Sequence, residues 1–212
     1  MNRTRIPRKK NLWSIAGIVV AIVIALVWIA LANGGENNEE DLLSELRQEL
    51  IPLEGSATDY GIPYSLSSLP QFVEWWVTLV PEVENDPRYI ESLSALVAPC
   101  CDDNPAYSCC CEGEEGQACN IIRSGKGLAA HLIHDLDYPL DQVQASVLDW
   151  FRFARPDYYL AVALQEQGVS PKRHDLTDRG SCYRGMCNTA VSLGGCGGMN
   201  ELIEPALYDA DT

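Results

Sequence analysis

The cysteines are the residues of this chain whose number and spacing indicate chemical activity, either metal binding or thiol chemistry. Nine cysteines occur among 212 residues, and six of them lie within residues 100–119 as a pair, a triplet and a single residue. Adjacent cysteines do not readily bond to each other. Their Cα atoms lie about 3.8 Å apart across a trans peptide, whereas a relaxed disulfide needs roughly 4.4 to 6.8 Å. Each therefore needs a distant partner or a metal ion, or it remains a thiol.

Three kinds of chemistry fit such a cluster. Thiolates at short spacing bind soft metals such as Cu(I), zinc or an iron–sulfur cluster, although no C-x-x-C pair indicates a zinc site. Disulfides to the later cysteines would make a structural framework, and the odd number leaves at least one cysteine outside it. Thiol–disulfide exchange is disfavoured, because the surrounding carboxylates oppose an activated thiolate. We expect part of the set to be cross-linked and part to bind a soft metal such as copper, from the candidate ligands Cys100, Cys101, Cys109, Cys110, Cys111, Cys119, Cys182, Cys187, Cys196 and Met199.

Other residues give weaker signals. His131 and His134 stand three residues apart on an expected helix, but by helical angle they fall opposite its apolar stripe, so we expect a solvated polar face rather than a metal pair. Met186 lies beside Cys187, where a thioether could add a ligand for Cu(I). No serine–histidine–aspartate order, nucleotide-binding glycine loop or H-E-x-x-H motif is present, so the sequence does not indicate an enzyme.

The N-terminal region predicts a membrane anchor. Residues 12–32 are free of charge and long enough to cross the hydrocarbon core as a helix. Basic residues precede this run and acidic residues follow it, which predicts a cytoplasmic N-terminus and an extracytoplasmic body. A cleaved signal peptide is the alternative, since residues 30–32 resemble a cleavage site, but the run exceeds the usual apolar length of about 7 to 15 residues. Both interpretations export the cysteines to an oxidising compartment.

The charge balance restricts the partners. The chain has 15 basic and 30 acidic residues, a net charge of −15, and its N-terminal tail holds a large share of the basic ones. Such an acidic body repels nucleic acid and anionic lipid surfaces. We therefore expect no nucleic-acid partner. The expected partners are the membrane, crossed once, and a membrane protein.

Apolar residues at helical spacing predict a mainly α body. A short helix is expected before Pro52, and a second over residues 69–83. In the second helix, Trp75 and Trp76 fill the core or form a docking patch. Another helix is expected from Pro87 toward the cysteine cluster, and three more between residues 120 and 168. The glycine-rich segment 176–199 predicts a loop held by cross-links or metal rather than by a core. The expected organisation is a cytoplasmic basic tail (1–11), a transmembrane helix (12–32), a tether and juxtamembrane segment (33–68), a small exported helical cysteine-rich domain (69–170), and a Gly/Cys-rich loop with an acidic tail (171–212).

The layout resembles two exported bacterial groups. One comprises small proteins named for a Pro-Cys-Tyr-Cys-Gly-Cys motif, in which a helix runs into a Pro-Cys cluster, as here at Pro99, Cys100 and Cys101. This resemblance implies metal binding, although the alternating cysteines and the lipid-attachment cysteine are absent. The other is the membrane-anchored thiol subunit of cytochrome c maturation, which residues 127–160 resemble in layout without its C-x-x-C. This second resemblance implies a thiol-redox or haem-assembly role.

Together these features predict a membrane-anchored extracytoplasmic cysteine-rich protein that binds or handles a soft metal such as copper. Two alternatives remain open. One is a thiol–disulfide redox or haem-assembly factor. The other is a disulfide-stapled structural or interaction domain of a membrane complex.

Overall fold

The computed structural model describes part of the chain, namely residues 38–94, 118–178, 180–181, 184–198, 203 and 207. The predicted membrane segment 12–32 lies outside this part. Within it, no helix has the length and apolar character needed to cross a bilayer. The chain divides into two compact units, Met1–Ser44 and Glu45–Thr212. A helix over residues 38–50 crosses this boundary and ends before Pro52, as the sequence predicts.

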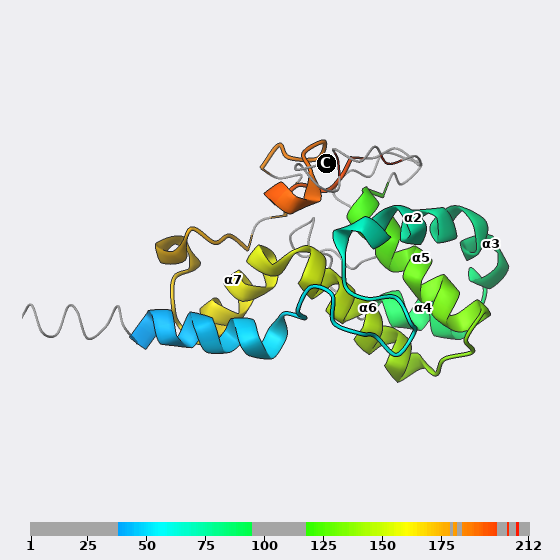
Figure 1. Ribbon diagram of the computed structural model, residues 1–212, viewed down its shortest axis with the longest axis horizontal. Coiled ribbons are helices and arrows are strands. Elements are labelled where there is room, and N and C mark those ends of the chain that lie inside the picture. The colour runs from blue at the N-terminus through cyan, green and yellow to red at the C-terminus, as the bar shows by residue number, and fades with distance from the viewer. Residues whose placement is uncertain are drawn as a thin grey trace, which may run out of the picture. The chain divides into compact units, whose positions relative to one another are not determined.

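The second unit consists of helices and loops, without a strand in the stretches that the structure covers (Figure 1). The prediction of a mainly α fold is therefore confirmed. The predicted helix after Pro87 is described only to Ser94, so its approach to the cysteine cluster lies outside the described residues. In chain order the elements are η1 (Leu66–Ser68), α2 (Leu69–Thr78), α3 (Val80–Val83), α4 (Pro87–Ser94), α5 (Asn120–His134), α6 (Leu140–Ala154), α7 (Pro156–Glu166), η2 (Pro171–His174) and η3 (Val191–Leu193).

From the sequence we expect Pro139 in the first turn of one helix, Pro156 at the end of that helix and Gly168 as the cap of the next. Pro156 stands at the start of α7, a position where its missing N–H breaks no helical hydrogen bond. Pro139 is the N-cap of α6 rather than a residue of its first turn. Gly168 follows α7 with a left-handed φ of 75°, and its N–H donates to the carbonyl of Gln165 at 2.9 Å. These residues limit α6 and α7 and so fix the bend between them.

The helical core is centred on α5. Helices α2, α3, α4 and α6 all pack against α5, and Figure 1 shows α2 and α5 side by side. The predicted stripe is confirmed, because Leu128, Ala129, Leu132 and Ile133 are buried. Burial continues around the first turns of α5, where Ile121 is also fully buried. A helix that is covered on most of its faces is a central helix rather than a surface one.

Two glycines allow this close packing. A Cβ atom on Gly127 would overlap the backbone carbonyl of Phe72 and would lie 2.6 Å from the backbone nitrogen of Trp76. A Cβ atom on Gly125 would overlap the ring of Phe151. Glycine is therefore required on both sides of α5, because any side chain would force α2 or α6 away.

Aromatic rings fill the space between α2, α5 and α6. Trp150 is fully buried, lies edge-to-face against Phe72 with ring centroids 4.7 Å apart, and donates its indole N–H to Ser124 Oγ at 2.7 Å. Trp75 is half-buried and packs against the core. Arg123 lies 4.5 Å above the half-buried Trp76 ring in a cation–π contact. The expectation that the two tryptophans fill the core thus holds for Trp75, whereas the half-buried Trp76 contacts Arg123.

Candidate functional site

The described cysteines lie around one junction, where the C-terminal loop meets the N-terminus of α5. They are Cys119, Cys187 and Cys196. We use the name C-terminal loop for residues 184–198. The remaining predicted ligands lie outside the described residues: Cys100, Cys101, Cys109, Cys110, Cys111, Cys182 and Met199.

The junction is made by the first backbone groups of α5. The N–H of Asn120 donates to the carbonyl of Gly198 at 2.9 Å, and the N–H of Ile121 donates to the carbonyl of Cys196 at 3.3 Å. The buried side-chain amide of Asn120 donates to the carbonyl of Gly197 at 2.6 Å. The first N–H groups of a helix have no partner within it. The C-terminal loop therefore caps α5 with its own carbonyls.

The same loop residues are also bonded to the earlier part of the loop. Cys196 donates its N–H to the carbonyl of Met186 at 3.3 Å, and Gly198 donates its N–H to the carbonyl of Cys187 at 2.9 Å. Gly197 and Gly198 have left-handed φ angles of 69° and 80°, which glycine adopts without strain. The glycines thus let one short segment contact α5 on one side and residues 186–187 on the other.

The three cysteines differ in chemical state. Cys119 immediately precedes α5 as its N-cap. Cys119 and Cys196 are both thiols with no exposed surface. Cys187 is disulfide-bonded and half-buried. Among the described residues, the sulfur atoms that could become thiolate ligands are therefore those of Cys119 and Cys196.

A buried arginine anchors another part of the loop, around Gly194. Arg155, between α6 and α7, has a side chain that is 1% exposed. Its guanidinium makes a two-pronged contact with Asp157, with Nε–Oδ1 and Nη2–Oδ2 distances of 3.0 Å each. It also donates to Ser181 Oγ, which in turn donates to the carbonyl of Gly194 at 2.8 Å. Arg184 reaches the same carbonyl at 3.1 Å, so two arginines hold this end of the loop.

Sequence reasoning missed this anchor. Arg155 lies in an aromatic-rich stretch, and the one local signal is an aspartate two residues later at a helix start. The prediction that segment 176–199 is held by cross-links or metal rather than by a core is wrong in one respect. Val191 and Cys196 belong to the hydrophobic core. The physical reason is the density of glycine, which lets the backbone approach the helices closely enough to bury these side chains.

The histidines on α5 form a cluster with one carboxylate. The Nδ1 atoms of His131 and His134 each lie 2.6 Å from an oxygen of Asp135. Hydrogen bonds from His134 and then His131 lower the pKa of the Asp135 carboxyl. His131 also stacks face-to-face on Trp75, with ring centroids 3.8 Å apart. The predicted solvated face is right for the exposed His134 and wrong for His131, whose ring α2 covers.

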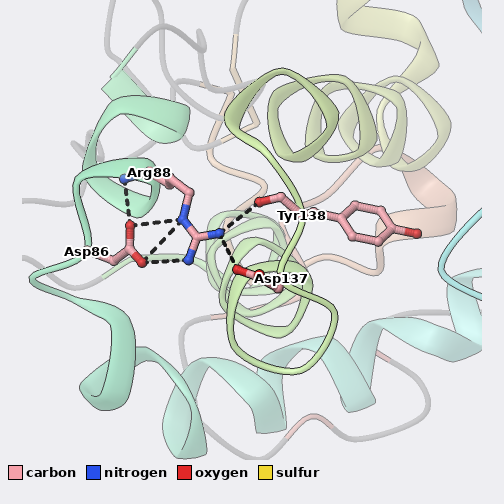
Figure 2. Close-up of polar contacts among 4 residues, drawn as sticks. All are labelled: Asp86, Arg88, Asp137 and Tyr138. Carbon is pink, nitrogen blue, oxygen red and sulfur yellow. Dashed lines mark hydrogen bonds and ion pairs between the residues drawn. The ribbon is translucent and has the colours of Figure 1, made fainter.

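A second charged cluster ties α4 to the turn between α5 and α6 (Figure 2). Arg88 binds Asp86 with an Nη2–Oδ2 distance of 2.9 Å and Asp137 with an Nη1–Oδ1 distance of 2.7 Å, and Figure 2 shows the guanidinium between the two carboxylates. It also donates to the backbone carbonyl of Tyr138 at 3.2 Å. Hydrogen bonds from Arg88 lower the pKa of the Asp86 carboxyl. Since α4 precedes and α5 follows the cysteine segment 95–117, this cluster helps to fix the helices on both sides of it.

The described residues do not include a ready-made multidentate metal site. No three histidine, cysteine, aspartate or glutamate side chains in this part of the chain come close enough together to hold a metal ion. The histidine cluster supplies two imidazoles and one carboxylate, but the carboxylate lies between the imidazoles as their hydrogen-bond partner. The candidate site is therefore the junction itself, with its two buried thiols. Comparisons of the chain with protein-family models, with curated proteins and with solved structures found no match.

Proposed function

We propose that this protein is a membrane-anchored, extracytoplasmic, cysteine-rich module that binds a soft metal ion, best represented by Cu(I), and presents it to a membrane partner. The uncharged segment 12–32 supports the anchor, and the basic residues before it support a cytoplasmic N-terminus. The nine cysteines support the metal-binding role. No residue pattern supports a catalytic role.

One observation supports the proposal most directly. Cys119 and Cys196 come from the two cysteine-rich segments, far apart in the sequence, and both are buried thiols at the N-terminus of α5. The backbone bond between Ile121 and Cys196 links the two segments. Soft thiolate ligands select Cu(I) over hard cations. Burial of both thiols would also shield a thiolate-bound Cu(I) ion from competing oxygen ligands.

The two thiols at this junction are enough to bind Cu(I). Structural zinc sites use four ligands, usually cysteines and histidines. In the part of the chain that the structure describes, the thiols at this junction are those of Cys119 and Cys196. Cu(I) is satisfied by a pair of thiolates. The cysteines of segment 100–111 would then be a further ligand pool for the ion.

The test is a Cu(I) titration of the full chain, purified in detergent without reductant and kept anaerobic, against a coloured Cu(I) chelator. We expect the wild type to retain copper and the double variant Cys119→Ser/Cys196→Ser to bind its tightest copper at least about tenfold more weakly. The variant Val191→Ala is the control, because it removes buried volume from the same loop without removing sulfur. The proposal is wrong if the wild type holds no Cu(I), or if the control loses as much affinity as the double variant.

A second function, a disulfide-stapled interaction domain of a membrane complex, is favoured by the disulfide of Cys187. The Arg155 anchor supports it too, because its ion pair and the Ser181 hydrogen bond hold the loop in place without a metal. Alkylation without reductant, followed by peptide mapping by mass spectrometry, separates the two functions. Labelling of Cys119 and Cys196 only after unfolding identifies them as thiols and favours the metal site. Labelling only after unfolding and reduction identifies a disulfide and favours the staple.

A further inference from the structure

A polar pocket lies away from the cysteine junction, between the loop 57–64 and α6. Its volume is about 220 Å³, and its lining includes three tyrosines, two aspartates and a serine. The tyrosines are Tyr60, Tyr64 and Tyr138, and the polar residues include Asp59, Ser146 and Asp149. This combination of phenol rings and carboxylates in one hollow offers a ligand both aromatic faces and negative charge.

The loop that forms one wall is held in a defined shape. The N–H of Gly55 donates to the carbonyl of Tyr64 at 2.7 Å, and the N–H of Tyr64 donates to the carbonyl of Ser56 at 3.1 Å. The hydroxyl of Thr58 donates to the carbonyl of Ile62 at 2.6 Å. These bonds close the loop on itself. The pocket wall is therefore pre-organised, which lowers the entropic cost of binding.

The core positions the tyrosine rings. Tyr60 packs edge-to-face on Phe72 with ring centroids 6.4 Å apart, and Tyr64 packs on Phe153 at 5.5 Å. The backbone of Tyr138 is held by Arg88, and Figure 2 shows its phenol ring directed away from that charged cluster. These contacts hold the phenol rings of Tyr60 and Tyr64 in fixed positions in the pocket wall.

The pocket carries negative charge. None of the described lining residues is basic. Burial, and then the charges of Asp149 and Asp59, raise the pKa of Tyr64 to about 12, so its phenol stays neutral and keeps its O–H. The charges of Asp59 and Asp149 therefore both reach the Tyr64 phenol group in the pocket. One oxygen of Asp149 accepts from Arg152 at 3.1 Å, which offsets part of this charge.

We propose that this pocket binds a small protonated alkylamine. The carboxylates of Asp59 and Asp149 would balance the ammonium charge, the tyrosine rings would contribute cation–π attraction, and the phenol and Ser146 oxygens would accept its N–H groups. A primary ammonium suits this site better than a quaternary one, because the lining is rich in hydrogen-bond acceptors. The inference concerns a site separate from the thiol junction and does not depend on the proposed copper binding.

The test is calorimetric titration of the full chain in detergent with butylammonium, at low salt and neutral pH. Three variants on α6 are compared. Asp149→Asn removes one of the two carboxylate charges of the pocket, and we expect at least about tenfold weaker binding. Arg152→Gln removes the competing cation and is expected to tighten binding severalfold. Asp141→Asn changes the same charge in the exposed first turn of α6, outside the pocket lining, and is expected to leave binding unchanged.

Several outcomes would overturn the proposal. Absence of butylammonium binding at millimolar concentration refutes it directly. Equal losses in Asp141→Asn and Asp149→Asn would show diffuse attraction to an acidic surface instead of a pocket. Weaker binding in Arg152→Gln, with the helical circular dichroism unchanged, would contradict the assigned charge balance. Glucose binding without amine binding would assign a sugar site, and tetramethylammonium binding as tightly as butylammonium would contradict the role of N–H donors.

Discussion

The helical core and the C-terminal loop are held together by different forces. Around α5, apolar side chains and two glycines bring the helices into close contact, and the polar groups there, such as Ser124 and Trp150, satisfy each other. The C-terminal loop buries only a few apolar side chains. Its position depends on Arg155, on Asn120 and on backbone bonds to glycine carbonyls. In the core, substitutions that add volume should therefore destabilise the fold most, and substitutions that change polarity should destabilise it less. In the loop, stability should depend on individual hydrogen bonds.

The largest expected effect comes from Gly127→Ala in the core. The new Cβ atom would overlap the backbone of Phe72, which cannot move without displacing α2. We expect the free energy of unfolding to fall by about 3 kcal/mol or more, measured by chemical unfolding followed by circular dichroism.

Gly168→Ala is the matched control, because open space surrounds that glycine and only its left-handed φ of 75° resists the change. Its expected loss is about 1 kcal/mol. Equal losses in the two variants would contradict the close approach of α2 and α5.

The next effect in size is that of Arg155→Met in the loop anchor. Removal of the guanidinium leaves Asp157 without its main partner. Because Asp157 is 27% exposed, we expect the free energy of unfolding to fall by about 2 kcal/mol. Breaking a fully buried pair would lower it by roughly 3 to 5 kcal/mol. Hydrogen exchange should show faster opening of residues 184–198 with the helices still protected.

Arg184→Met tests the specificity of that anchor. Arg184 is exposed and binds the same aspartate, Asp157, at 3.4 Å. We therefore expect Arg184→Met to lower the free energy of unfolding by less than about 1 kcal/mol. If hydrogen exchange in residues 184–198 is equally fast in both arginine variants, the burial of Arg155 is not what holds the loop.

The smallest expected effect concerns pH and the histidine cluster on the core surface. Hydrogen bonds from His134 and His131 lower the pKa of Asp135 from an ordinary value of 3.8. A lowered folded-state pKa gives a stabilisation that is present above the unfolded-state value and is lost as pH falls through the folded-state value. The melting temperature of the wild type should therefore exceed that of His134→Gln near pH 5, and the difference should shrink as the pH falls below 3.8. A difference that persists at the lower pH would indicate a cause other than this carboxylate.

The helices could be predicted because their signals are local. The stripe around Leu128 and Leu132, Pro156 at the start of α7 and Gly168 after its end each act within a few residues. The two-sided burial of α5 was harder to predict, because it depends on which helices surround it. Gly125 and Gly127 fit close packing, but the order of residues along the chain does not say that Phe72 and Phe151 are the neighbours that approach them.

The junction could be predicted only in outline. Sequence reasoning brought the two cysteine-rich segments together, but it gave no reason to single out Cys119 and Cys196. Their proximity depends on the pairing of Asn120 with Gly197 across most of the described domain. The pocket beside Tyr64 was not predicted for the same reason, since it forms between a loop and a helix that are distant in sequence.

The cap that Gly198 and Cys196 place on α5 also has a consequence for the order of events during synthesis. The N-terminus of α5 emerges well before the loop that closes over it. Until that loop arrives, Asn120 lacks its partners and Cys119 lacks its neighbour. The chain therefore passes through an interval in which Cys119 is open to oxidants and metal ions. A metal ion or an oxidant that reaches the Cys119 thiol in that interval would be enclosed when Gly197 and Gly198 pack against the start of α5.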